Sequence, residues 1–206
     1  MSRSAVVLAG GLSSRFGQDK GLLRLAGKPL VRHVLDALKS VVDERVVVVS
    51  SEARTRSYES AVGSGVEVAV DELQEHSPLV GALTGFRVAN GEYCLLLPCD
   101  TPFVSREVLL LLFDLCLGKA AVIPRWPNGY LEPLHAVYSR EMALDAAVKA
   151  LGEGKLNMRG MVDRLRGVRY VSTLVLQQLD PELWTFFNVN TLLDLKKAEA
   201  MLRHAR

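Results

Sequence analysis

A glycine-rich segment at residues 8–20 carries the residue types that bind phosphate. Its glycines allow the backbone to approach a ligand closely, so that successive N–H groups can cradle phosphate oxygens. These glycines are Gly10, Gly11 and Gly17. Arg15 and Lys20 add positive charge to the same segment. The spacing matches neither GxxxxGK[ST] nor GxGxxG, so the segment predicts a phosphate site of another kind, with a plain glycine-rich turn as the alternative.

Two aspartates follow apolar runs farther along the chain. Asp71 comes directly after the run at 66–70, and Asp100 follows the run at 93–97. Mg²⁺ prefers one or two carboxylates together with phosphate oxygens, so one well-placed aspartate is enough to hold it against a nucleotide. The alternatives are a solvated turn for Asp71 and a capping role before Pro102 for Asp100.

The elements that must position these groups alternate along the chain. Short runs of β-branched and aliphatic residues are typical of strands buried on both faces. These runs cover residues 5–8, 45–49, 66–70, 93–97 and 120–123. Segments with a 3.6-residue repeat lie between them, which predicts an α/β fold with a mostly parallel sheet and helices on both faces. Ligands of such sheets bind beyond the carboxyl ends of the strands, where the glycine-rich segment and both aspartates are expected.

Three helices have recognisable starts. One is expected to begin with Pro29 in its first helical position. Ser105 is the expected N-cap of a helix at 106–117, and Thr191 that of a helix at 192–202. The least regular stretches are 125–132 and 152–160.

Composition narrows the class of protein. The chain has 206 residues, 49% hydrophobic and 23% charged, which is ordinary for one globular domain with a sizeable core. A net charge of +2 argues against a nucleic-acid partner. No apolar run approaches the ~20 residues that span a bilayer, and no secretory signal is recognisable, so we expect no membrane partner and a cytoplasmic location. Three cysteines without CxxC spacing make disulfides or a zinc knuckle unexpected.

The segment 8–20, LAGGLSSRFGQDK, resembles the signature of the molybdenum cofactor guanylyltransferases, often called MobA. Residues 25–30, LAGKPL, are also similar to that family. The resemblance implies a single Rossmann-like nucleotidyltransferase domain over residues 1–206. It also implies transfer of GMP from GTP to the phosphate of molybdopterin, with release of pyrophosphate. The residues implied to contact the nucleotide here are Leu8, Ala9, Gly10 and Lys20.

Two later segments extend the resemblance. Residues 97–102, LPCDTP, match the family's pattern, and this match makes Asp100 the Mg²⁺ ligand. Residues 187–191, FNVNT, resemble the family's Asn-x-Asn-Thr segment before the terminal helix. Asn188 and Asn190 each offer a donor and an acceptor, which suits a metal-bound phosphate or a pterin edge. Helix capping is the alternative for both.

A Gly-Pro-Leu-x-Gly loop of the family corresponds to residues 77–81, SPLVG, with Ser77 where glycine is usual. The resemblance implies that this loop, including Pro78 and Gly81, packs against the base. It also implies that the preceding Asp71 contacts the nucleotide.

An acceptor site is expected in the second half of the chain. Six basic residues there suit a phosphorylated pterin, although a solvated basic face explains them as well. They are Lys149, Lys155, Arg159, Arg164, Arg166 and Arg169. Residues 132–135, EPLH, are expected to shape the same pocket.

The expected reaction needs no covalent intermediate. The acceptor phosphate attacks the α-phosphorus of GTP in line, and catalysis consists of alignment and charge neutralisation by Mg²⁺, Arg15, Lys20 and Asp100. Transient contact with other cofactor-biosynthesis proteins is also expected. Molybdopterin cytidylyltransferases and sugar-phosphate nucleotidyltransferases remain alternatives with the same fold. A non-catalytic nucleotide-binding regulator is the alternative of another class, and the presence of Lys20 and Asp100 disfavours it.

Overall fold

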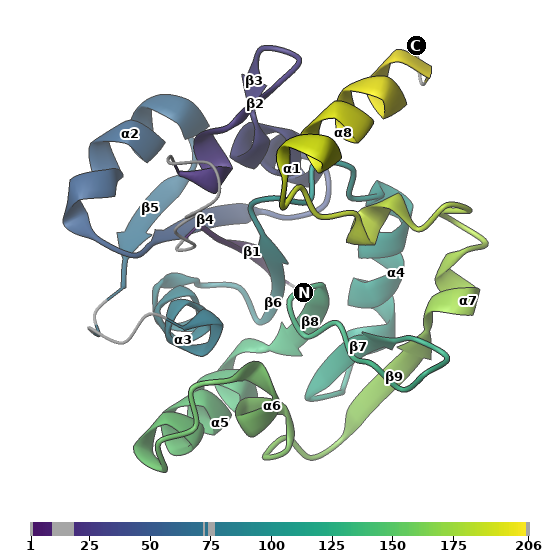
Figure 1. Ribbon diagram of the computed structural model, residues 1–206. Helices are drawn as coiled ribbons and strands as arrows, with labels where there is room; N and C mark the ends of the chain where they lie inside the picture. Colours follow the sequence, from purple (N-terminus) through teal and green to yellow (C-terminus); the bar gives the residue numbers. More distant parts are fainter. Residues whose placement is uncertain (1, 10–18, 72, 74–76, 205–206) are drawn as a thin grey trace.

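A twisted sheet forms the centre of the computed structural model, which describes residues 2–9, 19–71, 73 and 77–204 (Figure 1). Seven strands of this part of the chain pair in the order β5-β4-β1-β6-β8-β7-β9. Their bounds are β1 Arg3–Leu8, β4 Glu44–Val49, β5 Glu67–Val70, β6 Tyr93–Pro98, β7 Ala121–Arg125, β8 Ala136–Ser139 and β9 Val168–Ser172. β8 runs antiparallel to β6 and β7, and the other pairings are parallel. The carboxyl ends of β1, β4, β5, β6, β7 and β9 therefore share one edge of the sheet.

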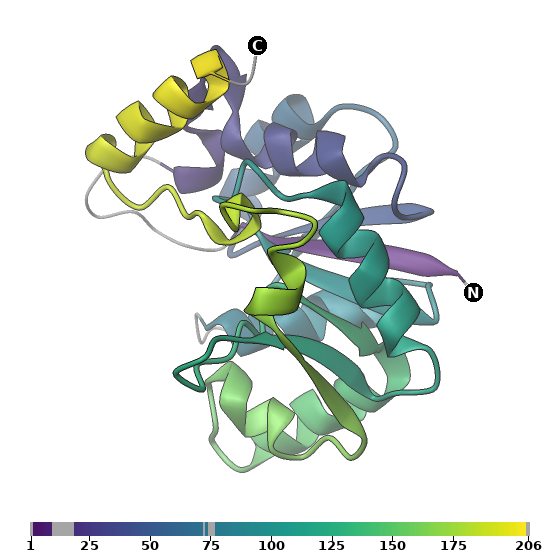
Figure 2. The same ribbon diagram turned by 90° about the vertical axis from the view of Figure 1, so that its right-hand side faces the viewer.

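Helices cover both faces of the sheet, as predicted. α1, α2 and α4 pack on one face, while α3, α5 and α6 pack on the other (Figures 1 and 2). The helices are α1 Leu30–Leu38, α2 Glu52–Val62, α3 Pro78–Val88, α4 Arg106–Cys116, α5 Arg140–Gly152, α6 Met158–Val162, α7 Thr173–Leu176 and α8 Leu192–His204. Two 3₁₀ turns, η1 Lys20–Leu22 and η2 Trp184–Phe186, and a small hairpin of β2 Arg24–Leu25 and β3 Lys28–Pro29 complete the described elements. None of the described helices is both long enough and apolar enough to cross a membrane.

The central strands are buried on both faces because their side chains alternate between two cores. In β1, Ala5 and Val7 belong to the core under α1, α2 and α4, while Val6 belongs to the opposite core. This confirms the interpretation of the apolar runs. The interpretation is wrong for β5, which is not buried on both faces because it lies at the edge of the sheet. Glu67 is exposed there, and the other side chains of β5 are only half-buried.

Two of the three predicted helix starts are confirmed. The Oγ of Ser105 accepts a hydrogen bond from the N–H of Val108 at 3.3 Å at the start of α4. Thr191 and Asp194 bond reciprocally at the start of α8, since each side chain accepts from the other's N–H, at 3.2 and 2.8 Å. Pro29 precedes α1 as its N-cap and is not its first helical residue, because it pairs with β2 in the small hairpin.

The two stretches expected to be the least regular consist mostly of turns, bends and irregular backbone. Residues 125–132 continue β7 into a tight turn, in which Arg125 bridges to Leu131 and the N–H of Trp126 donates to the C=O of Tyr130 at 2.8 Å. Residues 152–160 hold the end of α5 and the start of α6. β8 and β9 were not predicted from the sequence, and they widen the sheet beyond β6.

Candidate active site

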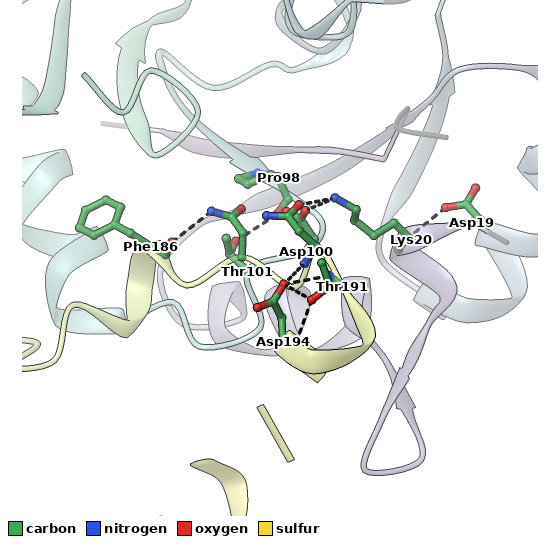
Figure 3. Close-up of polar contacts among 11 residues, drawn as sticks. Asp19, Lys20, Pro98, Asp100, Thr101, Phe186, Thr191 and Asp194 are labelled. Atoms are coloured by element: carbon green, nitrogen blue, oxygen red, sulfur yellow. Dashed lines mark hydrogen bonds and ion pairs between the residues drawn. The ribbon is translucent and has the colours of Figure 1, made fainter. Parts of the chain in front are cut away.

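Three side chains from distant parts of the chain meet at the carboxyl edge of the sheet (Figure 3). The Nζ of Lys20 lies 2.8 Å from Oδ2 of Asp100 and donates to Oδ1 of Asn190 at 2.7 Å. Lys20 begins η1, Asp100 follows β6, and Asn190 precedes α8. The structure thus brings together three of the residues that the sequence singled out.

Backbone hydrogen bonds and a small apolar cluster hold this meeting point in place. The N–H of Cys99 donates to the C=O of Leu8 at 3.1 Å, so the pairing of β1 with β6 continues up to Asp100. The N–H of Val189 donates to the C=O of Asp100 at 2.9 Å, which ties the segment before α8 to the end of β6. Val189 is buried with Leu23, Leu25, Leu30 and Ala198, which dock α8 against η1 and the small hairpin. The three polar groups are therefore positioned by the backbone as well as by one another.

The carboxylate of Asp100 has one oxygen committed and one open. The residue is only 7% exposed. Oδ2 is paired with Lys20, whereas the buried Oδ1 has no hydrogen-bond partner among the described residues. A buried polar atom without a partner is costly, which suggests that a ligand or ion completes its coordination. A divalent cation that takes its other ligands from phosphate oxygens fits this arrangement. The described residues contain no group of three or more His, Cys, Asp or Glu side chains that could hold a metal without a substrate.

Lys20 is anchored by its neighbour Asp19, which caps η1. Oδ1 of Asp19 accepts from the N–H of Gly21 at 3.2 Å and from the hydroxyl of Tyr58 at 2.5 Å. Oδ2 lies 2.9 Å from the guanidinium of Arg54. Both Arg54 and Tyr58 come from α2, which the sequence analysis did not predict. No local motif marks these two residues, because their role depends on α2 packing beside η1.

The packing around η1 leaves no room for a side chain at position 21. A Cβ on Gly21 would overlap the hydroxyl oxygen of Tyr58 and lie 3.1 Å from the Sγ of Cys99. Burial raises the pKa of the Tyr58 hydroxyl well above its usual range, and the nearby Cys99 and Asp19 add to this effect. Burial also raises the pKa of the Cys99 thiol, assisted by Asp100. Both groups are therefore neutral, and they support η1 structurally.

A second set of predicted residues converges at the ends of β1 and β5. A Cβ on Gly81 would lie 3.2 Å from Cδ2 of Leu8 and 3.7 Å from Oδ1 of Asp71. The N–H of Asp71 donates to the C=O of Val49 at 2.9 Å, so Asp71 continues the pairing of β4 with β5. The N–H of Ala9 likewise donates to a β4 carbonyl, at 2.8 Å. Leu8, Ala9, Asp71 and Gly81 thus lie at the same edge as Lys20 and Asp100.

The segment expected to be a base-binding loop is the first turn of a helix. Pro78 and Gly81 belong to α3, and Ser77 is its N-cap, with Oγ accepting from the N–H of Val80 at 3.2 Å. The C=O of Ser77 also accepts from the N–H of Gly81 at 3.2 Å. Serine at this position therefore supplies a side-chain cap that glycine lacks. Residues 77–81 are therefore not a loop, because Pro78 occupies the first position of a helix, where its missing N–H costs nothing. Their contact with the base stays a prediction.

Asn188 does not contact the lysine–aspartate pair directly. Its Nδ2 donates to the C=O of Phe186 at 3.1 Å, so it braces its own segment of the chain. Gly10, Gly11 and Arg15 lie outside the described residues. Their proposed contacts with phosphate stay predictions.

An aromatic and acidic cluster connects the turn after β7 with the segment before α8. Nε1 of Trp126 donates to Oε1 of Glu132 at 2.7 Å, and Oε2 of Glu132 lies 3.7 Å from Nδ1 of His135. The rings of Trp126 and His135 both pack edge-on against Phe186, with centroids 5.7 and 5.2 Å away. The side chain of His135 is buried, and neither ring nitrogen has a hydrogen-bond partner within the described parts of the chain. Residues 132–135 therefore stabilise Phe186, whose C=O accepts the hydrogen bond from Asn188.

The basic residues expected at an acceptor site have different individual contacts. Lys149 and Arg164 form ion pairs with nearby carboxylates, and Arg169 donates to a backbone carbonyl on α4. Arg159 lines a pocket between α6 and the turn after β7. A shared basic acceptor site therefore stays a prediction.

A mostly parallel α/β sheet thus gathers a lysine, an aspartate and an asparagine at its carboxyl edge, where such sheets bind their ligands. Residues 5–168 match the family described as the MobA-like NTP transferase domain. The chain belongs to this family, which confirms the resemblance seen in the sequence.

Individual relatives extend this match over nearly the whole chain. A probable molybdenum cofactor guanylyltransferase of Methanosarcina mazei is 35% identical, with 99% of this chain and 92% of that protein covered. The molybdenum cofactor guanylyltransferase of Desulfosudis oleivorans is 33% identical, with 98% and 97% covered. The solved structure of molybdopterin-guanine dinucleotide biosynthesis protein A from Archaeoglobus fulgidus superimposes with a TM-score of 0.83 at 30% identity, covering 98% of this chain and 99% of that one.

Proposed function

We propose that this protein transfers GMP from GTP to molybdopterin, releasing pyrophosphate and forming molybdopterin guanine dinucleotide. One observation carries the proposal: Lys20, Asp100 and Asn190 meet at the carboxyl edge, and Asp100 retains a buried, open oxygen. The guanylyltransferase names of relatives that align along nearly the whole chain support it. Residues 1–206 would form a single nucleotidyltransferase domain. A cytoplasmic location and transient contacts with other cofactor-biosynthesis proteins belong to the same proposal.

The nucleotide would lie along the carboxyl ends of β1, β5 and β6. Asp71 and the start of α3 would face the base, and the 8–20 segment would hold the phosphates. The proposed nucleotide contacts are Leu8, Ala9, Gly10, Gly11, Arg15, Lys20, Asp71, Pro78, Gly81, Asn188 and Asn190. Guanine presents two adjacent donors, N1–H and N2–H₂, which suit a carboxylate or backbone carbonyls at this edge. Adenine would leave such acceptors unpaired, so GTP should be preferred.

Alignment and charge neutralisation would account for catalysis. An oxygen of the acceptor phosphate forms a bond to the α-phosphorus while the bond to the β-phosphate oxygen breaks, and pyrophosphate leaves with that electron pair. No general base is required, because a phosphate monoester is already ionised near neutral pH. The ammonium of Lys20 offsets the charge of the two polyanions, and Asn190 orients that ammonium. Mg²⁺ held by Asp100 would neutralise the charge that develops on phosphate oxygens.

The experiment is to incubate the purified protein with Mg²⁺, molybdopterin and each nucleoside triphosphate in turn, and to measure pyrophosphate release. The proposal predicts the highest kcat/KM with GTP. A value for CTP equal to or above that for GTP would identify a cytidylyltransferase instead. Tight GTP binding without turnover with any triphosphate would favour the non-catalytic regulator.

A further inference from the structure

A pocket of about 450 Å³ opens at the carboxyl ends of β7 and β9, away from the lysine–aspartate pair. Its walls come from the end of β7, the turn that follows, α6 and β9. The lining residues are Arg125, Gly129, Tyr130, Leu131, Pro133, Arg159, Val162 and Tyr170. This volume lies within the range of roughly 300–1,000 Å³ that small-molecule sites occupy. We call it the β7–β9 pocket.

The β7–β9 pocket combines aromatic faces with positive charge. Tyr130 is 64% exposed and Tyr170 is 43% exposed. The guanidinium of Arg125 lies over the ring of Tyr170, 5.6 Å from its centroid. Arg159 contributes a second cation, whose acidic partner Asp163 is 3.7 Å away and largely exposed. Such a loose surface pair is weak, so Arg159 can turn to an anionic ligand at little cost.

The aromatic wall of the pocket is held by an ordered turn. The N–H of Tyr130 donates to Oδ1 of Asn128 at 3.0 Å, and its C=O accepts from the N–H of Trp126 at 2.8 Å. Trp126 is in turn fixed by its bond to Glu132 and by packing on Phe186. Tyr130 is therefore presented on a braced support, which lowers the entropy lost when a ligand binds.

The strand order places the pocket within reach of the lysine–aspartate pair. β6 and β7 both border β8, and they run in the same direction, so their carboxyl ends lie on one edge. Adjacent strands are ~4.8 Å apart, which separates the ends of β6 and β7 by roughly 10 Å. A ligand whose phosphate lies beside Asp100 could therefore place a ring roughly 10 Å away, in the β7–β9 pocket.

We propose that the β7–β9 pocket binds the ring system of the acceptor, with Tyr130 and Tyr170 stacking on the pterin and with Arg125 and Arg159 donating hydrogen bonds to its carbonyl oxygen and ring nitrogens. This inference rests on the proposed function, because it takes the acceptor to be a phosphorylated pterin. It assigns acceptor recognition to side chains on β7, the turn that follows it, β9 and α6, whereas the nucleotide lies toward β1 and β5.

The test uses pterin-6-carboxylate, a stable, fluorescent, planar anion that lacks the reacting phosphate. Adding the full-length protein to pterin-6-carboxylate should quench the fluorescence of this probe until binding is saturated. Tyr170→Ala should raise its Kd about tenfold, the usual contribution of one aromatic stacking contact. Tyr170→Phe, which keeps the ring, and Arg166→Ala, which removes an exposed arginine outside the pocket lining, should stay within about twofold of wild type.

Charge reversal gives a second variant that is safe for folding, because Arg159 is exposed. Arg159→Glu should weaken pterin-6-carboxylate binding more than Tyr170→Phe does, and should raise the KM for molybdopterin while leaving the KM for GTP unchanged. If Tyr170→Ala and Arg159→Glu both bind the probe like wild type, the pocket assignment is overturned while guanylyl transfer can still stand. If the probe binds in a Tyr170-dependent way but the wild type does not use molybdopterin, the proposed function fails and the pocket remains a site for pterin-like anions.

Discussion

The two ends of the carboxyl edge differ in how rigidly their side chains are held. At β1 and β6, Lys20 and Asp100 are largely buried, pair at 2.8 Å and are tied through the backbone to the segment before α8. At β7 and β9, Tyr130 and Tyr170 project from the surface around an open pocket. In-line transfer between phosphates requires close alignment, whereas stacking on a ring tolerates small displacements. The firm end is therefore suited to chemistry, and the open end to recognition.

This contrast predicts that the two ends separate in steady-state kinetics. Changes at the β1–β6 end should lower kcat, because they act on groups that contact the transferring phosphate. Changes at the β7–β9 end should raise the KM for the acceptor, because they act on binding that is equal in the ground state and the transition state.

Lys20→Ala should have the largest effect among these substitutions, a loss of roughly 10²–10³ in kcat. Its ammonium contacts both Asp100 and Asn190, so its removal leaves the phosphate charge without a fixed cation. Pyrophosphate release measures the rate, and a thermal melt checks the fold. Lys149→Ala, an exposed lysine on α5, is the matched control and should keep wild-type kcat. Near-wild-type turnover by folded Lys20→Ala would break the assignment of chemistry to the β1–β6 end.

Tyr130→Ala should come next, with a rise of about tenfold in the KM for molybdopterin and an unchanged kcat. The backbone bonds of the turn do not involve the phenol ring, so the turn should persist. The measurement is initial rate against acceptor concentration at saturating GTP. A fall in kcat at unchanged KM would contradict the division between the two ends.

Tyr58→Phe should lower kcat by about two- to tenfold, the net value of a typical intramolecular hydrogen bond. The lost hydroxyl bonds to Asp19, which caps the turn that presents Lys20. Because Tyr58 acts through Asp19, the KM for molybdopterin should stay the same. Arg54→Lys should reduce kcat less than Arg54→Ala, since it keeps a cation beside Asp19. If Tyr58→Phe, Arg54→Lys and Arg54→Ala all lower kcat by the same factor and all lower the thermal stability equally, the cluster has a purely structural role.

Asp36→Asn should leave both kinetic constants unchanged, because Asp36 lies on α1 away from both ends. Burial raises its pKa, but bonds from Lys28 and Lys39 outweigh that effect and lower the pKa from 3.8 to about 2. The folded-state pKa is below the unfolded value, so this stabilisation is present above pH 3.8 and lost as the pH falls towards 2. Partial exposure limits it to about 1 kcal/mol. Urea melts at pH 6 should show this difference, and melts near pH 2 should not.

The β1–β6 end of the carboxyl edge could be predicted from the sequence, whereas the β7–β9 end could not. A glycine-rich segment directly after a strand places Lys20 at the carboxyl edge of a parallel sheet, and the same rule places Asp100 there. Asn190 followed from its motif before the capped terminal helix. These signals are local, so no long-range pairing had to be known.

The remaining features depend on contacts between distant segments. β8 has four residues and runs against its neighbours, so an alternation of strands and helices does not predict it. The β7–β9 pocket needs β9 beside β7, which only the pairing of Ala121 with Val168 and the residues that follow reveals. The sequence does not single out Arg54 and Tyr58 for the same reason, since α2 has a weak apolar face and its contact with Asp19 is tertiary.

The role of Asp100 is the central claim, and a Mg²⁺ titration of Asp100→Asn tests it most directly. The amide keeps the size of the side chain but loses the charge that would hold the cation beside the buried Oδ1 position. Pyrophosphate release from GTP and molybdopterin should require far more Mg²⁺ than in wild type, or should not be activated at all. Asp145→Asn, an exposed substitution on α5, should titrate like wild type. Full activity of Asp100→Asn at the wild-type Mg²⁺ concentration would contradict the account.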